Sequence, residues 1–430
     1  MKVNAATLDY IRAHVHDDVR QLAFRPVPAG VDLRTALIQI EGRQLAAHKL
    51  PTWAATDGLL FPPRLALEQC SSEVTAAYKR RVVESLHHHD SISNDSFSTF
   101  LDLTGGLGID FTAIAPLFER AIYVEQQEQL CNLARHNFPL LGLADAEVRC
   151  AEAEETLDSF SAPLYQCSPS LEKKLTVIFI DPARRDAAGH KVARIEECAP
   201  NVCSLQDLLR ATADFILIKL SPMLDVTAAL MALRDIVEVH IVSVCGECKE
   251  LLFLMRGNHQ NRLNRQDSEQ APSPETCPVY CIDLLTADIM SSFTFTRAEE
   301  AAAPLQLAGS LSTYLYEPNS SILKAGAFKT VCQRFPVYKL ASQSHLYTSQ
   351  QLITDFPGRI WRIMDSATFS KQDLRRLLAG ITAADLTVRG FPISVAALRR
   401  QLRLREGGQH QFIATTLGQQ RLLLKVERTH

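Results

Sequence analysis

The segment FLDLTGGLGIDF, which runs from Phe100 to Phe111, decides the fold of this chain. It reads as a short apolar strand, a turn with glycines at 105, 106 and 108, and the start of a helix. A glycine loop between a strand and a helix lets the backbone approach a nucleotide and directs the first helical amides towards the ligand. A dinucleotide fingerprint would need a third glycine at the position of Phe111, so the segment disfavours NAD.

The spacing within this segment resembles the D-x-x-x-G-x-G signature of class I methyltransferases. Asp102 is followed four residues later by Gly106 and then, after one residue, by Gly108. In those enzymes the signature lies against the amino-acid end of S-adenosylmethionine. The resemblance therefore implies that S-adenosylmethionine is bound by Asp102, Thr104, Gly105, Gly106, Gly108 and Asp110.

The chain after this segment alternates between strand-like and helix-like stretches, the pattern of a doubly wound parallel sheet. Six apolar stretches read as strands: FLDLT, AIYVE, AEVRC, TVIFID, FILIKL and VEVHIVSV. PVYCIDLL, residues 278–285, is either the seventh, antiparallel strand that methyltransferase sheets carry or the first strand of a following unit. We predict an α/β fold with a Rossmann-like, seven-stranded methyltransferase sheet after a helical N-terminal region.

Acidic residues follow the second and third predicted strands, where such a fold would need them. Glu125 ends the second strand, and a carboxylate there can accept both ribose hydroxyls of the cofactor; Gln126 lies beside it. A solvated acid at a helix start is the alternative. Glu152, just past the third strand, can accept the exocyclic amine of adenine, with Glu154 as its competitor.

Two serines before the glycine loop are further candidates for the cofactor site. Ser71 and Ser72 belong to the polar segment EQCSSE within an otherwise helical stretch. They can contact the methionine end of the cofactor, or they can cap a helix. The sequence leaves both interpretations open.

The motif IDPARRD, residues 180–186, closes the fourth predicted strand, where methyltransferases present the acceptor to the methyl group. It resembles the D/N-P-P-Y/F motif of enzymes that methylate amino groups in nucleic acids, with Ala183 and Arg184 in place of the second proline and the aromatic residue. We expect Asp181 and Pro182 to hold an acceptor amine for in-line attack, with rate gained mainly by positioning. The missing aromatic residue removes the usual stacking platform for a base, which leaves the acceptor atom open.

Basic residues surround this motif. Arg184 and Arg185 can pair with phosphate, or can be solvated arginines of a surface turn. Lys219, at the end of the fifth predicted strand, faces the same cleft, and the sequence assigns no role to it.

Composition bounds the class of protein. Of the 430 residues, 47% are hydrophobic and 22% are charged, as in an ordinary globular protein of two to four domains. No apolar run approaches the roughly 18 residues that span a bilayer, and the charged N-terminus resembles no secretion signal. We therefore expect a cytoplasmic protein without a membrane partner.

Cysteine usage bears on redox state and on metal binding. Eleven cysteines, an odd number, fit reduced thiols better than a disulfide framework. Cys245, Cys248, Cys277 and Cys281 have spacings that would suit a structural zinc, but two of them lie in apolar strands, where buried free cysteine is common. We expect no obligate metal.

Charge is distributed unevenly along the chain. Residues 346–430 carry a net charge of +7, and the remainder carries −10. Residues 391–408 read as a helix with four arginines on its outer face, and QHQFIATTLGQQRLLLKVE reads as two strands around Gly418. This basic end predicts salt-sensitive phosphate contacts through Arg399, Arg400, Arg403 and Arg405.

Taken together, EQCSSE, DLTGGLGID, IDPARRD, YEPNSSILKAGAF and FPISVAALRRQLRLREGG resemble a family of bacterial class I methyltransferases over nearly the whole chain. That family joins a Rossmann methyltransferase domain to a small ferredoxin-like domain and a C-terminal THUMP-like domain. The resemblance implies four parts: a helical region at 1–90, the catalytic domain at 91–280, the ferredoxin-like domain at 281–345 and the basic THUMP-like domain at 346–430.

The resemblance also implies a substrate. The central domain looks like the cap guanine-N2 methyltransferases, and THUMP domains accompany enzymes that act on structured RNA such as tRNA. We therefore expect methylation of a base nitrogen in tRNA or rRNA. A methyltransferase for a small molecule or a protein, and a non-catalytic protein that binds S-adenosylmethionine and RNA, are the alternatives. The sequence does not indicate an oligomeric state.

Overall fold

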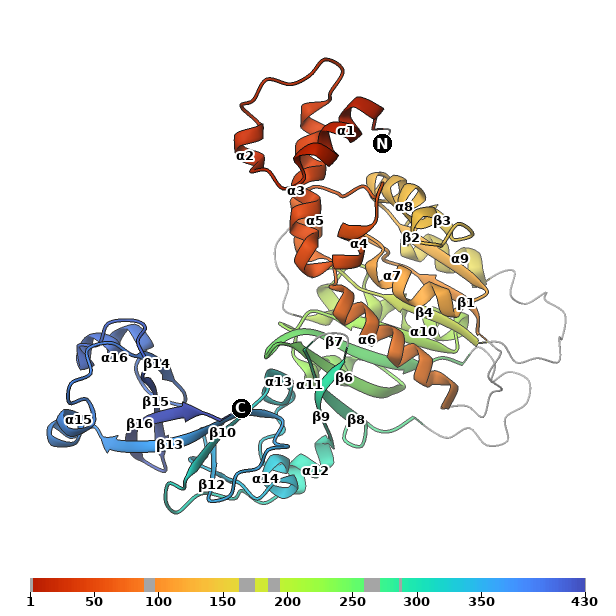
Figure 1. The fold of residues 1–430 in the computed structure, drawn as a ribbon. Helices are drawn as coiled ribbons and strands as arrows, with labels where there is room; N and C mark the ends of the chain where they lie inside the picture. The colour runs from red at the N-terminus through yellow and green to blue at the C-terminus, as the bar shows by residue number, and fades with distance from the viewer. Residues whose placement is uncertain are drawn as a thin grey trace. The chain divides into compact units, whose positions relative to one another are not determined.

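The structure, a computed structural model, describes residues 3–88, 97–161, 175–184, 194–258, 271–285 and 288–429. The chain divides into two compact units (Figure 1). The first comprises Met1–Val239, Glu250–Pro272 and Thr286–Asp288, and the second comprises the rest. Among the described residues, no helix combines the length and the apolar character needed to cross a membrane.

In the described residues, six α-helices precede the first strand, and four of them begin at a residue whose side chain caps the helix. Asn4, Asp18, Asp32 and Ser72 each accept a hydrogen bond from a backbone N–H of the first turn, which satisfies a donor that a helix start leaves unpaired. The helices are α1 (Ala5–His14), α2 (Val19–Leu22), α3 (Leu33–Lys49), α4 (Pro51–Ala55), α5 (Arg64–Gln69) and α6 (Glu73–Glu84).

These helices pack against the loop that follows the first strand. Trp53 and Phe61, from the helical region, share one buried apolar cluster with Leu107 and Ile109 of the glycine segment. Burial of large apolar side chains stabilises such a contact by about 1.5–3 kcal/mol for each. The glycine loop is therefore fixed from one side by the N-terminal region.

Five parallel strands form the first part of the sheet, in the order β3-β2-β1-β4-β5. The order reverses between β1 and β4, and in open α/β sheets ligands bind outside the carboxyl ends of the strands at such a point. The fold thus predicts a crevice beside the ends of β1 and β4. The strands are β1 (Phe97–Asp102), β2 (Arg120–Glu125), β3 (Glu147–Cys150), β4 (Leu175–Ile180) and β5 (Phe215–Leu220).

The antiparallel strand of this sheet is not the one considered from sequence. β7 (Glu247–Arg256) lies antiparallel to β5, and β6 (Ile236–Val244) is the next strand in the order. Cys245 and Gly246 join β6 and β7 with φ of 51° and 78°, the left-handed pair that a two-residue hairpin turn needs. Because cysteine is an unusual residue for such a turn, the sequence did not reveal the hairpin.

PVYCIDLL instead forms β8 (Pro278–Leu284), which pairs antiparallel with β9 (Ile289–Thr296). The complete order is β3-β2-β1-β4-β5-β7-β6-β8-β9. The predicted α/β methyltransferase sheet is confirmed. Its seven strands run in the order β3-β2-β1-β4-β5-β7-β6, and among the described residues β8 and β9 extend the sheet beyond β6.

The helices between these strands lie against the sheet (Figure 1), and aromatic side chains are buried in this part of the core. The ring of Phe111 lies 4.9 Å from that of Phe138, 5.6 Å from Tyr123 and 5.8 Å from Phe100, centroid to centroid. Phe111, which occupies the place of a dinucleotide-binding glycine, is thus a core residue. The helices are α7 (Ile109–Ile114), α8 (Glu128–Leu140), α9 (Ala153–Ser161), α10 (Val202–Thr212) and α11 (Val226–Ala232).

The second unit contains a seven-stranded sheet in the order β11-β12-β10-β13-β16-β15-β14. Its strands are β10 (Tyr314–Pro318), β11 (Tyr338–Lys339), β12 (Tyr347–Ser349), β13 (Gly358–Thr368), β14 (Asp385–Val388), β15 (Gln411–Leu417) and β16 (Gln420–Arg428). Its helices are α12 (Arg297–Ala302), α13 (Ser320–Ala325), α14 (Thr330–Arg334), α15 (Lys371–Leu377) and α16 (Val395–Leu402). β15 and β16 form the predicted strand pair around Gly418.

The basic helix predicted over residues 391–408 is shorter than expected. α16 ends at Leu402, because Arg403 adopts a left-handed conformation with φ of 56° and its N–H bonds back to the carbonyls of Arg399 and Arg400. Arginine rarely occupies this conformation, so its side chain gave no signal for the helix end. Arg405 therefore lies beyond the helix.

We predict that Asn137 is a major point of attachment between the helical region and the sheet. Its buried side chain accepts a hydrogen bond from the N–H of Leu60 at 3.0 Å and donates one to the carbonyl of Leu60 at 2.8 Å. Asn137→Ala would leave both backbone groups of Leu60 buried without a partner. The free energy of unfolding, measured in urea, should therefore fall by about 2–4 kcal/mol. Asn132→Ala, at an exposed site on the same helix, should change this value by less than about 0.5 kcal/mol. Equal effects of the two changes would refute this role.

Candidate functional site

The three glycines after β1 serve different purposes. A Cβ atom on Gly105 would lie 2.1 Å from the ring of Tyr123, and one on Gly108, where φ is 87°, would lie 2.8 Å from the ring of Phe138. These two glycines are required by packing. Gly106, with φ of 55°, differs, because the nearest atom to its Cβ position is the carbonyl oxygen of Thr104 at 3.8 Å. The loop is therefore open for a ligand at Gly106.

Glu125, at the end of β2, holds this loop in place. Its buried carboxylate accepts hydrogen bonds from the N–H of Gly106 at 3.0 Å and of Gln127 at 2.8 Å. The hydroxyl of Tyr123 donates to the carbonyl of Gly106. Gln126, the next residue along, is exposed. The end of β2 thus presents a carboxylate of fixed orientation beside the glycine loop.

Asp102, at the end of β1, is a buried carboxyl group with an unusual charge environment. It accepts a hydrogen bond from the N–H of Thr104 at 3.0 Å and is 1% exposed. Burial raises the pKa of Asp102 well above its ordinary value, and the nearby carboxylates of Asp110, Asp181 and Glu125 raise it further. A positively charged ligand beside Asp102 would be favoured by this surplus of carboxylates.

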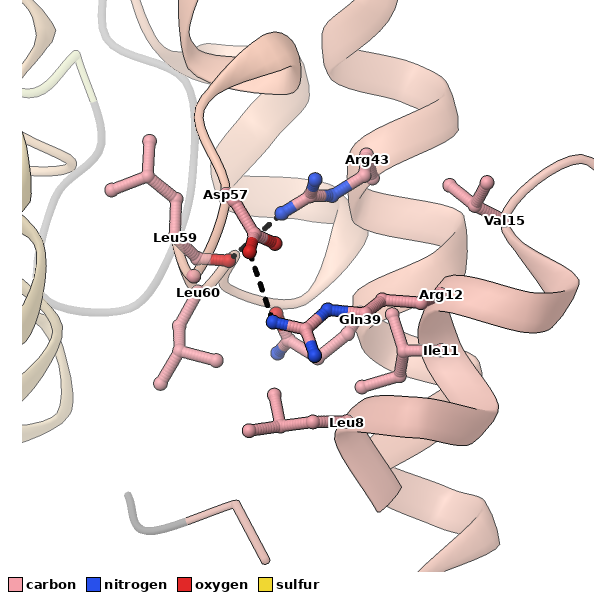
Figure 2. Close-up of a pocket in the computed structure, with 10 residues that line it drawn as sticks. Leu8, Ile11, Arg12, Val15, Gln39, Arg43, Asp57, Leu59 and Leu60 are labelled. Carbon is pink, nitrogen blue, oxygen red and sulfur yellow. Dashed lines mark hydrogen bonds and ion pairs between the residues drawn. The ribbon is translucent and has the colours of Figure 1, made fainter. Parts of the chain in front are cut away.

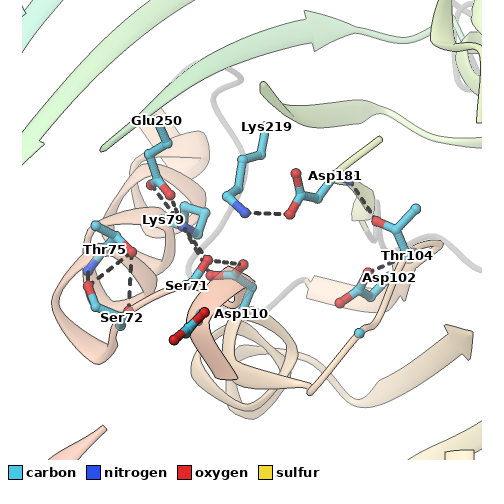
Figure 3. A network of polar contacts seen from close by, with 12 residues as sticks. Ser71, Ser72, Thr75, Lys79, Asp102, Thr104, Asp110, Asp181, Lys219 and Glu250 are labelled. Carbon is cyan, nitrogen blue, oxygen red and sulfur yellow. Dashed lines mark hydrogen bonds and ion pairs between the residues drawn. The ribbon is translucent and has the colours of Figure 1, made fainter. Parts of the chain in front are cut away.

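Asp181, directly after β4, lies next to the glycine segment. Its N–H donates to the hydroxyl oxygen of Thr104 at 2.6 Å, and its carboxylate forms an ion pair with Lys219 at the end of β5 (Figure 3). β4 and β5 are neighbouring parallel strands with Ile180 opposite Ile218, so their next residues meet. The side chain of Asp181 is 35% exposed, so the carboxylate is accessible to an acceptor.

The residues after Asp181 are held by one further strand-like contact. Pro182 is buried, and Ala183 exchanges two backbone hydrogen bonds with Ala199, at 2.7 and 3.0 Å. Arg184 is half-buried at the end of this stretch. Arg185 lies outside the described residues.

Behind the glycine segment lies a buried network of charged side chains (Figure 3). The hydroxyl of Ser71 donates to Asp110 at 2.6 Å, and the ammonium of Lys79 lies 3.0 Å from Asp110. Lys79 also contacts both carboxylate oxygens of Glu250 at 2.7 Å. Ser72 caps α6, because its side chain accepts a hydrogen bond from the N–H of Thr75. A helix cap was one of the two interpretations of this serine.

The remaining predicted site residues follow β3 or belong to the second unit. Glu152 follows β3 at the same edge of the sheet and is exposed, and Glu154, in the first turn of α9, is half-buried. In the second unit, Arg399 donates to the carbonyls of Ala384 and Arg405, each at 2.9 Å. Three exposed arginines follow it: Arg400, Arg403 and Arg405.

A small pocket of about 160 Å³ lies among the N-terminal helices (Figure 2). The polar side chains in its wall are those of Arg12, Gln39, Arg43 and Asp57. Arg12 forms an ion pair with Asp57 at 2.9 Å, and Arg43 donates to the carbonyl of Thr56 at 3.3 Å. Burial lowers the pKa of Arg43. The pocket has no residue from the strand ends, so it is separate from the candidate site.

The cysteines considered for zinc have different environments. Cys245 is exposed and Cys248 half-buried, whereas Cys277 and Cys281 are buried. Within the part of the chain that the structure describes, no three or more His, Cys, Asp or Glu side chains are grouped to hold a metal ion.

The sequence did not point to Lys79 or Glu250. Lys79 lies on the apolar face of α6, with Val82 and Val83 at helical spacing from it. A lysine on an apolar helix face could have indicated a buried, paired charge. Glu250 lies in β7, the strand that the sequence did not reveal. Their contact joins residues 171 positions apart, which no local pattern reports.

Comparison with known proteins agrees with this arrangement. Residues 314–357 match a ferredoxin-like domain, and residues 358–428 match a THUMP domain-like family. Two Mycobacterium tuberculosis proteins, from strains CDC 1551 / Oshkosh and ATCC 25618 / H37Rv, are each named an uncharacterized S-adenosylmethionine-dependent methyltransferase. Each is 23% identical over 388 residues, which is 87% of this chain and 90% of its own length.

A solved structure matches nearly the whole chain. The crystal structure of a proposed methyltransferase from Porphyromonas gingivalis W83 is 31% identical in sequence, with a TM-score of 0.81. The match covers 99% of this chain and 98% of that one. The chain therefore belongs to the family of bacterial class I S-adenosylmethionine-dependent methyltransferases that carry ferredoxin-like and THUMP-like C-terminal domains.

Proposed function

We propose that this methyltransferase transfers the methyl group of S-adenosylmethionine to a base nitrogen in structured RNA, either tRNA or rRNA, and that Asp181 orients the acceptor amine. The observation that carries the proposal is the position of Asp181. Its carboxylate is accessible and is fixed by Lys219, and its backbone N–H donates to Thr104 of the glycine segment. Exposed arginines in the THUMP-like region supply the contacts for RNA.

The residues at the strand ends fit the cofactor. The open side of Gly106 leaves room for it between the packed glycines 105 and 108. Glu125 has its carboxylate oriented by two backbone amides and retains lone pairs for the ribose hydroxyls. Glu152 lies past β3, on the adenine side, with Gln126 beside the ribose.

Electrostatics also favour this cofactor. When bound, S-adenosylmethionine supplies a methyl group on a positively charged sulfur, and it carries a positive amino group as well. Asp102 and Asp110 lie at the methionine end. Burial is the main cause of the raised pKa of Asp102, and the carboxylates of Asp110, Asp181 and Glu125 add to it, so a cation bound beside Asp102 would favour its ionised form. Ser71 supports this end by holding Asp110.

The chain's own residues act mainly by positioning the acceptor. One oxygen of Asp181 is engaged by Lys219, which leaves the other to accept an N–H of the acceptor amine. The amine lone pair then forms the new N–C bond as the C–S bond breaks, and Asp181 accepts the proton that the nitrogen releases. Pro182 and Arg184 continue the wall of the acceptor site.

Support for RNA comes from the second unit. The THUMP-like match spans residues 358–428, and residues 346–430 carry the net charge of +7. Arginines contact phosphate through several parallel N–H donors, which gives affinity without base specificity. The acidic remainder of the chain would otherwise repel a polyanion.

The proposal is tested by tritiated methyl transfer from S-adenosylmethionine into undermodified total RNA, followed by nucleoside analysis. Label in one modified nucleoside is expected and would name the acceptor. Label that appears only in protein or in small molecules of a cell extract would favour those acceptors instead. Cofactor binding by calorimetry with no label in any fraction would indicate a non-catalytic protein.

Asp181→Ala and Asp181→Asn should each reduce this transfer by about 100-fold or more, because the acceptor amine loses its orienting and proton-accepting carboxylate. Cofactor affinity should stay within about threefold, since Asp181 acts on the acceptor. Asp145→Asn, at an exposed turn, serves as the control and should retain full activity. Full transfer by either Asp181 variant would exclude the mechanism.

Gly106→Asn should weaken cofactor binding while the fold survives. Asparagine tolerates the left-handed conformation, and its side chain would extend into the open side of the loop. Gly142→Asn is the matched control, because Gly142 is also left-handed, with φ of 81°, and has no atom within 4 Å of its Cβ position. Calorimetry should show at least about a tenfold loss of affinity for the first variant alone. Equal affinities would place the cofactor elsewhere.

Replacing Arg400, Arg403 and Arg405 by glutamine should weaken binding of bulk tRNA by about tenfold at moderate salt. The slope of log affinity against log salt should become shallower by about 2–3, because each arginine that neutralises a phosphate adds about one to that slope. The control replaces Arg12, Arg25 and Arg64, which already form ion pairs with Asp57, Asp17 and Glu68, and so changes net charge equally. If both triple variants bound tRNA equally weakly, the effect would be one of net charge and not of this site.

A further inference from the structure

The side chains of two lysines and three acidic residues lie close together beside the glycine segment, residues 100–111 (Figure 3). They come from five different elements of the first unit: Lys79 from α6, Asp110 from α7, Asp181 after β4, Lys219 from β5 and Glu250 from β7. Three carboxylates share two ammonium groups. The carboxylate with which each lysine pairs therefore affects how Asp181 is held.

Lys219 lies within electrostatic reach of all three carboxylates. In the β5–β7 pairing it is opposite Leu252, so Glu250, two residues before Leu252, has its side chain on the same face of the sheet. Burial would lower the pKa of Lys219, but the carboxylates of Asp181, Asp110 and Glu250 raise it overall. Lys219 is therefore held as a cation, and it forms its ion pair with Asp181 alone among the three.

Lys79 accounts for that selectivity. Its ammonium is fully buried and lies 2.7 Å from both oxygens of Glu250 and 3.0 Å from Asp110. A buried carboxylate without a compensating cation is costly, so in the absence of Lys79 both acids would compete with Asp181 for Lys219. Lys79 forms an ion pair with each of them, which leaves Lys219 to Asp181.

We propose that Lys219 is a positioning residue that fixes the Asp181 carboxylate for the acceptor amine, and that Lys79 keeps Lys219 on Asp181 by forming ion pairs with Glu250 and Asp110. This inference rests on the proposed role of Asp181 in methyl transfer. It makes α6, which precedes the catalytic sheet in the chain, a part of the acceptor site. The N-terminal helices would then determine the rate of transfer and not only the stability of the protein.

The first test compares Lys219→Met, Lys219→Arg and the control Lys49→Met. Lys49 belongs to α3 and donates to the carbonyls of Leu67 and Glu68, away from this cluster. Lys219→Met should lower kcat by about 10-fold or more with cofactor affinity within about threefold, Lys219→Arg should recover part of the loss, and Lys49→Met should match the wild type. A wild-type kcat for Lys219→Met would overturn the proposal.

The pH profile separates positioning from a purely structural role. Lys219→Met removes a cation from a cluster of carboxyl groups, which favours their protonated forms. On the acid side of the profile, the activity of Lys219→Met should therefore fall at a higher pH than that of the wild type. An unshifted profile would contradict the proposal. Within the described part of the chain, the charged and titratable groups that act on Asp181 or Lys219, or contact their partners, include Asp102, Asp110, Glu250, Lys79, Arg184, Cys70 and Cys198.

The second test addresses Lys79 by rescue. Lys79→Met should lower kcat, because Glu250 and Asp110 then draw Lys219 from Asp181, and adding Glu250→Gln should restore most of the loss by removing one competitor. All rates refer to folded protein, measured at a temperature where circular dichroism shows each variant intact. Failure of Glu250→Gln to restore kcat in a folded double variant would overturn the role of Lys79.

A third measurement remains informative even if no RNA is methylated. In a double-mutant cycle on urea unfolding, Lys219→Met and Asp181→Asn should together destabilise the protein by less than the sum of their separate effects. Additive effects would refute the ion pair and with it this inference. If the effects of the two changes on the free energy of unfolding were non-additive but no methyl group entered RNA, only the proposed function would be refuted.

Discussion

The burial of Lys79 is the constraint on which the rest of the site depends. An ammonium group without solvent contact is tolerated only when it is paired and hydrogen-bonded, and here its partners are Glu250, Asp110 and Ser71. Removing one partner of such a group costs about 3–5 kcal/mol, a large part of the stability of an ordinary domain. Helices α6 and α7 and strand β7 must therefore be packed in their native positions before the cluster is stable. Because α7 follows the glycine loop directly, this packing also fixes the loop.

Apolar packing acts in the same direction. Leu107 and Ile109, within the glycine segment, are buried together with Trp53 and Phe61 of the N-terminal helices. From the opposite side, Tyr123 and Phe138 leave no room for a Cβ on Gly105 or Gly108. A loop enclosed in this way loses little conformational entropy when a ligand binds, because its conformation is already fixed by the core.

The parts of the site that could be predicted from sequence are those encoded by short spacings. Asp102, Gly106 and Glu125 lie at the ends of consecutive strands, and a parallel sheet brings such ends to one edge whatever the details of packing. Lys79 and Glu250 could not be found in this way, because their contact depends on the antiparallel insertion of β7 next to β5. That insertion in turn depends on the left-handed conformation of Cys245, a residue type that does not signal a turn.

The end of the basic helix shows the same limit in the second unit. The apolar spacing of Leu398 and Leu402 predicted a helix, and the helix is present, but its end is set by the left-handed Arg403. Arg399 is consequently used to satisfy the carbonyls of Ala384 and Arg405, which leaves three of the four arginines expected on the outer face exposed. A pattern of alternating apolar and basic residues thus predicts which face is polar, whereas backbone carbonyls near a helix end determine which of the polar side chains are available to a ligand.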